Sequence, residues 1–136
     1  NVVLTIGTNK AAAEAGDSRV GYSLAAAWQP ADAGFIPSVS GGWSMSDPDD
    51  SDEDIHGWYV GLEWSDVFVE GNSFGTAIGQ APKVSDDYNQ IWEIFYKFVV
   101  TDNITITPTY FIIDEYSGSL TSDYVQGAYV KTTFTF

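Results

Sequence analysis

The chain has 136 residues, no cysteine and a formal net charge of −14 at pH 7. This length fits one domain, and the lack of cysteine excludes a disulfide framework or a thiolate metal site. The acidic balance excludes nucleic acid as a natural partner, because there is no basic footprint to bind phosphates. No run of about 18 apolar residues is present, so no membrane-spanning helix is predicted.

Eight segments alternate apolar with polar or small residues, a period of two that is typical of β-strands. In chain order the predicted strands are residues 2–7, 19–28, 35–45, 57–64, 68–79, 91–101, 104–113 and 126–136. No helix is predicted, so the fold class is all-β. Gly71 indicates a β-bulge in the fifth segment, which leaves open the face on which Glu70 lies.

The last segment shows the alternation most clearly. One face carries mainly apolar residues and the other carries residues that tolerate water. The chain stops on an aromatic residue, as bacterial outer-membrane barrels do, so Phe134 and Phe136 are predicted to form a C-terminal assembly signal.

Strand and link lengths point to a membrane barrel. Most predicted strands have about 8–11 residues, the span of a tilted membrane strand, whereas soluble strands average about 5–6. Short links are expected at 29–34, 65–67 and 101–103, and long links at 8–18, 46–56, 80–90 and 114–125. This alternation predicts an antiparallel up-and-down transmembrane β-barrel with short periplasmic turns and long external loops.

The charged residues follow the same division of the chain into strands and links. Thirteen of the 19 acidic residues lie in the four long links. Within the strands, charges fall on the face opposite the apolar one, as a water-filled lumen requires. The predicted pore-lining residues are Arg19, Tyr59, Glu63, Glu93, Lys97, Tyr129 and Lys131. The charged residues among them either form a constriction that selects ions or only keep the interior polar and hydrated. Both interpretations stay open.

An acidic run precedes the fourth strand. Its carboxylates suit Ca²⁺ or Mg²⁺, which makes four residues weak metal candidates: Asp49, Asp50, Asp52 and Asp54. The run lacks the central Gly and terminal Glu of a calcium loop, so the alternative is a solvated outer loop that gathers cations. His56 has no nucleophile and acid placed beside it. No enzyme activity and no cofactor are expected.

Several short motifs carry a family resemblance. They are Gly21-Tyr22-Ser23-Leu24-Ala25, Trp28-Gln29-Pro30, Gly57-Trp58-Tyr59-Val60-Gly61-Leu62-Glu63-Trp64, Gly75-Thr76-Ala77-Ile78-Gly79-Gln80-Ala81-Pro82, Asn103-Ile104-Thr105-Ile106-Thr107-Pro108 and Gly127-Ala128-Tyr129-Val130-Lys131-Thr132-Thr133-Phe134. With these motifs the chain resembles the C-terminal part of cyanobacterial outer-membrane porins, which are related to the OprB-like carbohydrate-selective porins.

The resemblance implies that residues 1–136 are about half of a 16-stranded barrel. It also implies a homotrimer in outer-membrane lipid, passive diffusion of inorganic ions and small solutes, and an N-terminal wall-anchoring domain. That domain and the earlier strands are absent from this chain.

Two alternatives remain. Eight strands also suffice for a self-contained small barrel that acts as an anchor or adhesin, with its interior filled by side chains. Small residues on the wet face, such as Gly21, Ser23, Ala25 and Ala27, favour an open interior. The other alternative is a soluble β-sandwich or lectin-like domain, in which the apolar faces meet as a dry core.

Overall fold

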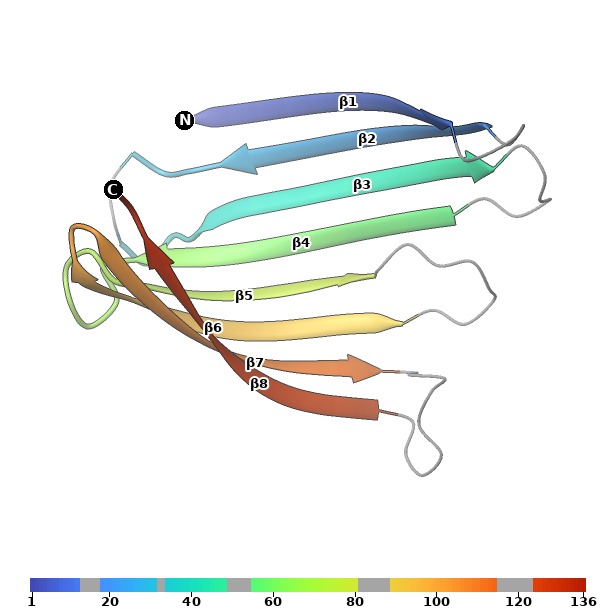
Figure 1. Ribbon diagram of the computed structural model, residues 1–136. Coiled ribbons are helices and arrows are strands. Elements are labelled where there is room, and N and C mark those ends of the chain that lie inside the picture. The colour runs from blue at the N-terminus through green and yellow to red at the C-terminus, as the bar shows by residue number, and fades with distance from the viewer. Residues whose placement is uncertain (13–17, 32–33, 49–54, 81–88, 115–123) are drawn as a thin grey trace.

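The computed structural model describes residues 1–12, 18–31, 34–48, 55–80, 89–114 and 124–136. The strands are β1 (Val2–Ala12), β2 (Ser18–Trp28), β3 (Ser38–Pro48), β4 (Ile55–Ser65), β5 (Ser73–Gln80), β6 (Gln90–Thr101), β7 (Ile104–Asp114) and β8 (Tyr124–Phe134). They form one antiparallel sheet in the order β1 to β8, so each strand pairs only with its neighbours in sequence (Figure 1). The sheet is open, with β1 and β8 at its edges. No helix among the described residues is long and apolar enough to cross a membrane.

The register gives the sheet two chemically different faces. Directly opposed residues of an antiparallel pair share a face. Val60 lies opposite Ile78, and Ile78 lies opposite Trp92, on what we call the apolar face. Gly61 lies opposite Ala77, and Ala77 lies opposite Glu93, on what we call the polar face. The predicted division of the strands into these two faces is confirmed by the register.

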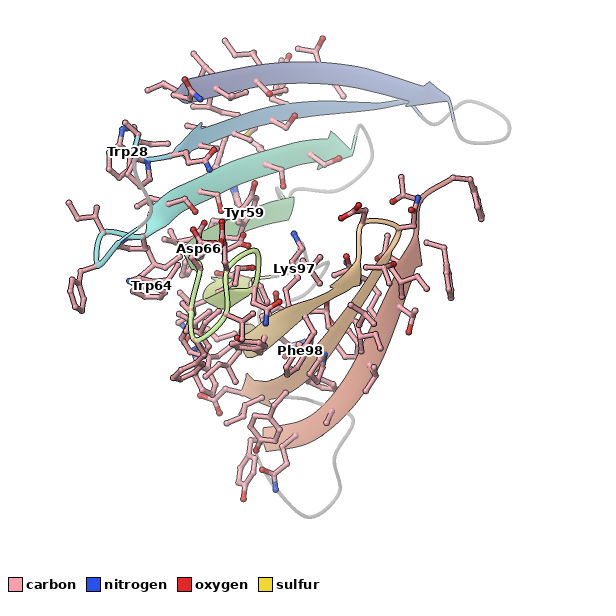
Figure 2. All side chains as sticks on the ribbon, turned by 90° about the vertical axis from the view of Figure 1, so that its left-hand side faces the viewer. Trp28, Tyr59, Trp64, Asp66, Lys97 and Phe98 are labelled. Carbon is pink, nitrogen blue, oxygen red and sulfur yellow. The ribbon has the colours of Figure 1, made fainter. Side chains whose placement is uncertain are left out.

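The sheet curves toward its polar face. Figure 2 shows the strands as an arc, with Trp28 and Trp64 on its outside and Lys97 on its inside. The strands are also staggered. The row of opposed residues that starts at Val2 of β1 reaches β8 at Ala128, six residues before β8 ends at Phe134. Closing a sheet into a barrel requires both curvature and stagger of this kind, and this sheet is open.

The sheet is a single layer without a covered core. Among the described residues, no large side chain is less than 2% exposed. Trp92, Tyr110 and Val130 on the apolar face are 37%, 38% and 65% exposed. A two-layer sandwich with these side chains packed in a dry centre is therefore not what the described residues form.

Several strand boundaries differ from the sequence prediction. β1 continues to Ala12, well beyond the predicted end at residue 7. β3 begins at Ser38 and not at 35, because Phe35 and Ile36 stand out from the link before it, 102% and 62% exposed. β8 ends at Phe134, so Phe136 lies beyond the strand.

The link between β4 and β5 is a folded turn, residues 66–72, and the β-bulge predicted at Gly71 is wrong. Asp66, Phe68 and Gly71 all have positive φ (57°, 64° and 85°), which reverses the chain before β5 starts at Ser73. The Asp66 carboxylate accepts a hydrogen bond of 2.7 Å from the Gly71 amide. This bond joins the first part of the turn to its end. Glu70 is exposed in this turn.

The predicted alternation of short and long links is also wrong in its lengths. Links 29–37, 66–72 and 102–103 at one end of the sheet have nine, seven and two residues. Links 13–17, 49–54, 81–89 and 115–123 at the other end have five, six, nine and nine. The difference arises because the first four strands run further toward the acid-rich end than their apolar pattern indicates, and because β3 and β5 start later than predicted at the other end, at Ser38 and Ser73.

Candidate functional site: the inner face of the sheet

The main hollow of the structure lies on the inner, polar face. It has a volume of about 730 Å³ and is lined by residues of β1 to β6 and of the turn before β5. Four of the predicted pore-lining residues meet there: Tyr59, Glu63, Glu93 and Lys97. An adjoining hollow of about 410 Å³ lies further toward the acid-rich end, and its inner-face lining includes small residues such as Ser23, Ala25 and Gly42.

The Glu63 carboxylate is positioned by the neighbouring strand. The Ser73 hydroxyl donates a hydrogen bond of 2.5 Å to Glu63 Oε1, and Ser73 itself is only 5% exposed. Opposite Glu63 stands Gly75, which has no side chain to crowd the carboxylate. Glu63 is thus held at the wall of the hollow. Sequence reasoning missed Ser73, because the phase of the fifth strand was left open.

Two of the three basic residues predicted to line the pore, Lys97 and Lys131, lie in one row of the sheet. Lys97 of β6 lies opposite Ser73, and Lys131 of β8 lies opposite Thr107. Lys97 lines the main hollow, whereas Lys131 lies on the same face beyond it. Glu93 is four residues before Lys97 on β6, which is about 13 Å along a strand. The inner face therefore presents separate acidic and basic positions across one hollow.

The remaining predicted residues take various positions. Tyr129 lies on the inner face opposite Thr109, with its ring centroid 6.2 Å from that of Phe111. Arg19 lies on the same face by register, opposite Pro48, and its side chain is outside the described part. The metal candidates Asp49, Asp50, Asp52 and Asp54 lie outside the described residues.

His56 is separated from the inner hollow. It lies opposite Met45 on the apolar face, exposed, with its ring centroid 6.1 Å from that of Trp43. It therefore points to the side of the sheet opposite Glu63 and Glu93.

Four aromatic side chains on the apolar face have polar tips that find partners within the protein. The indole N–H of Trp58 donates to Gln80 Oε1 at 3.0 Å, and that of Trp64 donates to the Phe35 carbonyl at 3.0 Å. The Tyr96 hydroxyl donates to the Val67 carbonyl at 2.5 Å. The Tyr110 hydroxyl donates to Gln126. These four groups need no solvent to satisfy them.

Comparison with known proteins gives one relevant similarity. The chain is 33% identical over 126 residues to the "Uncharacterized protein alr4550" of Nostoc sp. (strain PCC 7120), an alignment that covers 85% of this chain and 21% of the relative. The chain thus spans about a fifth of the length of that protein. No protein-family model matches the chain, and no solved structure matches it.

Proposed function

We propose that the chain is the C-terminal part of an outer-membrane porin, whose inner face lines a water-filled path for passive diffusion of inorganic ions and small solutes. The observation that carries the proposal is the segregation of charge in one curved sheet. Glu63, Glu93, Lys97 and Lys131 all lie on the inner face. Among the side chains that the structure describes, the apolar face carries a charge only at Asp114, at the end of β7 beside an acid-rich link.

The apolar face suits contact with lipid. Unpaired polar groups are costly in hydrocarbon, by several kcal/mol each, and four of the Trp and Tyr polar tips on this face are bonded internally. Aromatic side chains on this face also recur six residues apart, on β2 (Tyr22 and Trp28), β4 (Trp58 and Trp64) and β6 (Trp92 and Phe98), and all of these except Tyr22 lie near a strand end. Such aromatic positions flank the apolar band of membrane barrels.

The two open edges require further strands. Backbone groups on the outer sides of β1 and β8 have no ladder within the described chain, and an open edge is not tolerated in hydrocarbon. The alignment covers only 21% of the Nostoc relative, and a protein of that length leaves ample chain to supply them. The resemblance to cyanobacterial porins suggests a 16-stranded ring, assembled as a homotrimer, with no cofactor and no catalytic step.

The acid-rich links distinguish one end of the diffusion path from the other. They all leave the same end of the sheet, because consecutive antiparallel strands alternate in direction. Eleven acidic residues belong to them, and we assign this end to the outside of the cell. Acids at the mouth raise the local concentration of cations by an attraction that salt screens.

Single-channel recording of the full-length protein in planar lipid bilayers tests the proposal. Glu63→Gln and Glu93→Gln are expected to lower the preference for cations over anions, and Lys97→Gln to raise it. A unit charge about 10 Å from a permeating ion contributes roughly 0.4 kcal/mol in water, or about twofold in occupancy. Glu63→Gln keeps an acceptor for Ser73, so the wall is preserved.

Glu70→Gln is the matched control, because Glu70 lies exposed in the turn outside the hollow and its loss removes the same charge. If Glu63→Gln and Glu93→Gln both keep the wild-type ion selectivity, as Glu70→Gln does, the charges on the inner face do not select ions. They then serve only to keep the interior polar and hydrated. Lack of any conductance in the wild-type protein contradicts the porin function and favours the alternative of a self-contained barrel that acts as an anchor.

A further inference from the structure

Glycine and aromatic residues are paired across the strands of the inner face. Gly42 lies opposite Tyr59, Gly75 lies opposite Phe95, and Gly127 lies opposite Phe111. Glycine within a strand weakens it, because it loses more backbone entropy and offers no side chain to pack. Three such pairs on one face therefore call for a compensating role.

In each pair the aromatic ring occupies the space that a glycine Cβ would take. A Cβ on Gly127 would lie 2.7 Å from Phe111 Cζ and 3.0 Å from Cε1. A Cβ on Gly75 would overlap the outer atoms of the Phe95 ring, and one on Gly42 would overlap the Tyr59 ring. The rings thus lie over the neighbouring strand, against the wall of the sheet, and do not stand out from it.

The apolar face shows a contrasting case. Gly41 lies opposite Val60, and a Cβ there would meet only ordinary contacts, 3.4 Å to the Tyr59 carbonyl oxygen and 4.0 Å to Val60 Cγ2. Gly41 therefore receives no ring.

We propose that Gly42, Gly75 and Gly127 hold three aromatic rings flat against the inner wall and thereby set the free width of the diffusion path. This inference rests on the proposed porin function. A ring seated over glycine leaves the lumen open, whereas the same ring displaced from the wall narrows it. The glycines are positioning residues that determine which solute sizes pass.

Gly75→Ala is the direct test, made in the full-length protein. The atoms that would clash are the far end of the Phe95 side chain, so the ring moves and the backbone stays in place. Single-channel conductance is expected to fall, and the uptake of larger neutral solutes into vesicles to fall more than that of small ones. Gly127→Ala, which displaces Phe111, provides a second variant with the same expectation.

Removal of the ring distinguishes a role in width from a role in packing. Phe95→Ala alone is expected to change conductance little, because the ring lies against the wall. In the Gly75→Ala background the same substitution is expected to restore conductance to at least the wild-type value. This non-additivity is the signature of a coupled pair.

Two further glycines serve as controls. Gly41→Ala faces away from the lumen and is expected to leave conductance and solute size limit unchanged. Gly79→Ala would place its Cβ 2.6 Å from the Trp58 carbonyl oxygen and 3.1 Å from Tyr59 Cα, which are backbone atoms. It is expected to impair folding, measured as loss of the heat-modifiable band in gel electrophoresis, and so defines the phenotype of backbone disruption.

The outcomes separate the two proposals. A wild-type protein that does not conduct contradicts the porin function itself. A conducting wild type with unchanged conductance in Gly75→Ala and Gly127→Ala overturns the width role alone. Reduced conductance that Phe95→Ala fails to restore also overturns it, because the glycine then acts through packing of the sheet.

Discussion

Replacing Ile78 by arginine is expected to destabilise the proposed barrel in lipid, by less than the about 2–4 kcal/mol that a base costs at mid-depth on a lipid-facing surface, because Ile78 lies opposite Trp92 near the edge of the apolar band. Ile78 is 41% exposed and lies between Val60 and Trp92 on the apolar face. Its chain neighbour Ala77 lies between Gly61 and Glu93 on the inner face. Ala77→Arg is therefore expected to be far better tolerated, because the new charge meets water and the Glu93 carboxylate.

The pair is a matched comparison at nearly one depth on one strand. The measurement is the urea dependence of unfolding of the full-length protein in phospholipid vesicles, followed by tryptophan fluorescence. Equal destabilisation by the two substitutions, or a larger effect for Ala77→Arg, would contradict the assignment of the apolar face to lipid.

Asn72→Ala is expected to cost about 1–3 kcal/mol, because it leaves a part-buried backbone donor without its partner. Asn72 is only 6% exposed, and its side-chain oxygen accepts a hydrogen bond of 2.9 Å from the Val99 amide. Its amide nitrogen also donates to the Tyr96 hydroxyl at 3.3 Å. One side chain thus ties the turn before β5 to β6, close to the register shift between Val99 and Thr101.

Asn72→Asp separates the two interactions, since it keeps an acceptor for the Val99 amide and loses the donor to Tyr96. We expect it to be less destabilising than Asn72→Ala. Glu70→Ala, exposed in the same turn, serves as the neutral control. Hydrogen exchange at the Val99 amide reports the local effect. Equal protection of this amide in Asn72→Ala and wild type would show that the bond does not hold the turn.

The sheet was predictable because its residues alternate with the period of a strand. The existence and order of all eight strands, and the face taken by Tyr59, Glu63, Glu93 and Lys97, follow from that period alone. The antiparallel pairing of sequence neighbours was predicted from the links between the strands, and not from this period. Closure of the sheet remains a proposal.

The predicted strand boundaries are wrong where apolar residues belong to links or turns. Phe35 and Ile36 continue the strand pattern but stand exposed in a link, with the Phe35 carbonyl held by Trp64. Phe68 likewise reads as strand but adopts a positive φ, which the pattern cannot reveal. Asp66 and Gly71 could have predicted the turn before β5, because both residue types favour turns.

The finer features of the inner face depend on register, which sequence alternation does not specify. Ser73 reaches Glu63 only because Ser65 and Ser73 are opposed across β4 and β5. The pairing of Gly75 with Phe95 likewise requires the alignment of β5 with β6. These contacts join residues 10 and 20 positions apart, so they became visible only with the strand ladders.

Because every strand pairs only with its neighbours in sequence, the molecule is assembled from hairpins that are independent of distant parts of the chain. Adding or deleting one adjacent pair of strands would preserve the alignment of all the others and would keep each remaining connection at its own end. The number of strands in such a sheet can thus change stepwise during evolution, by duplication of a single hairpin. The residues of the existing strands need not change.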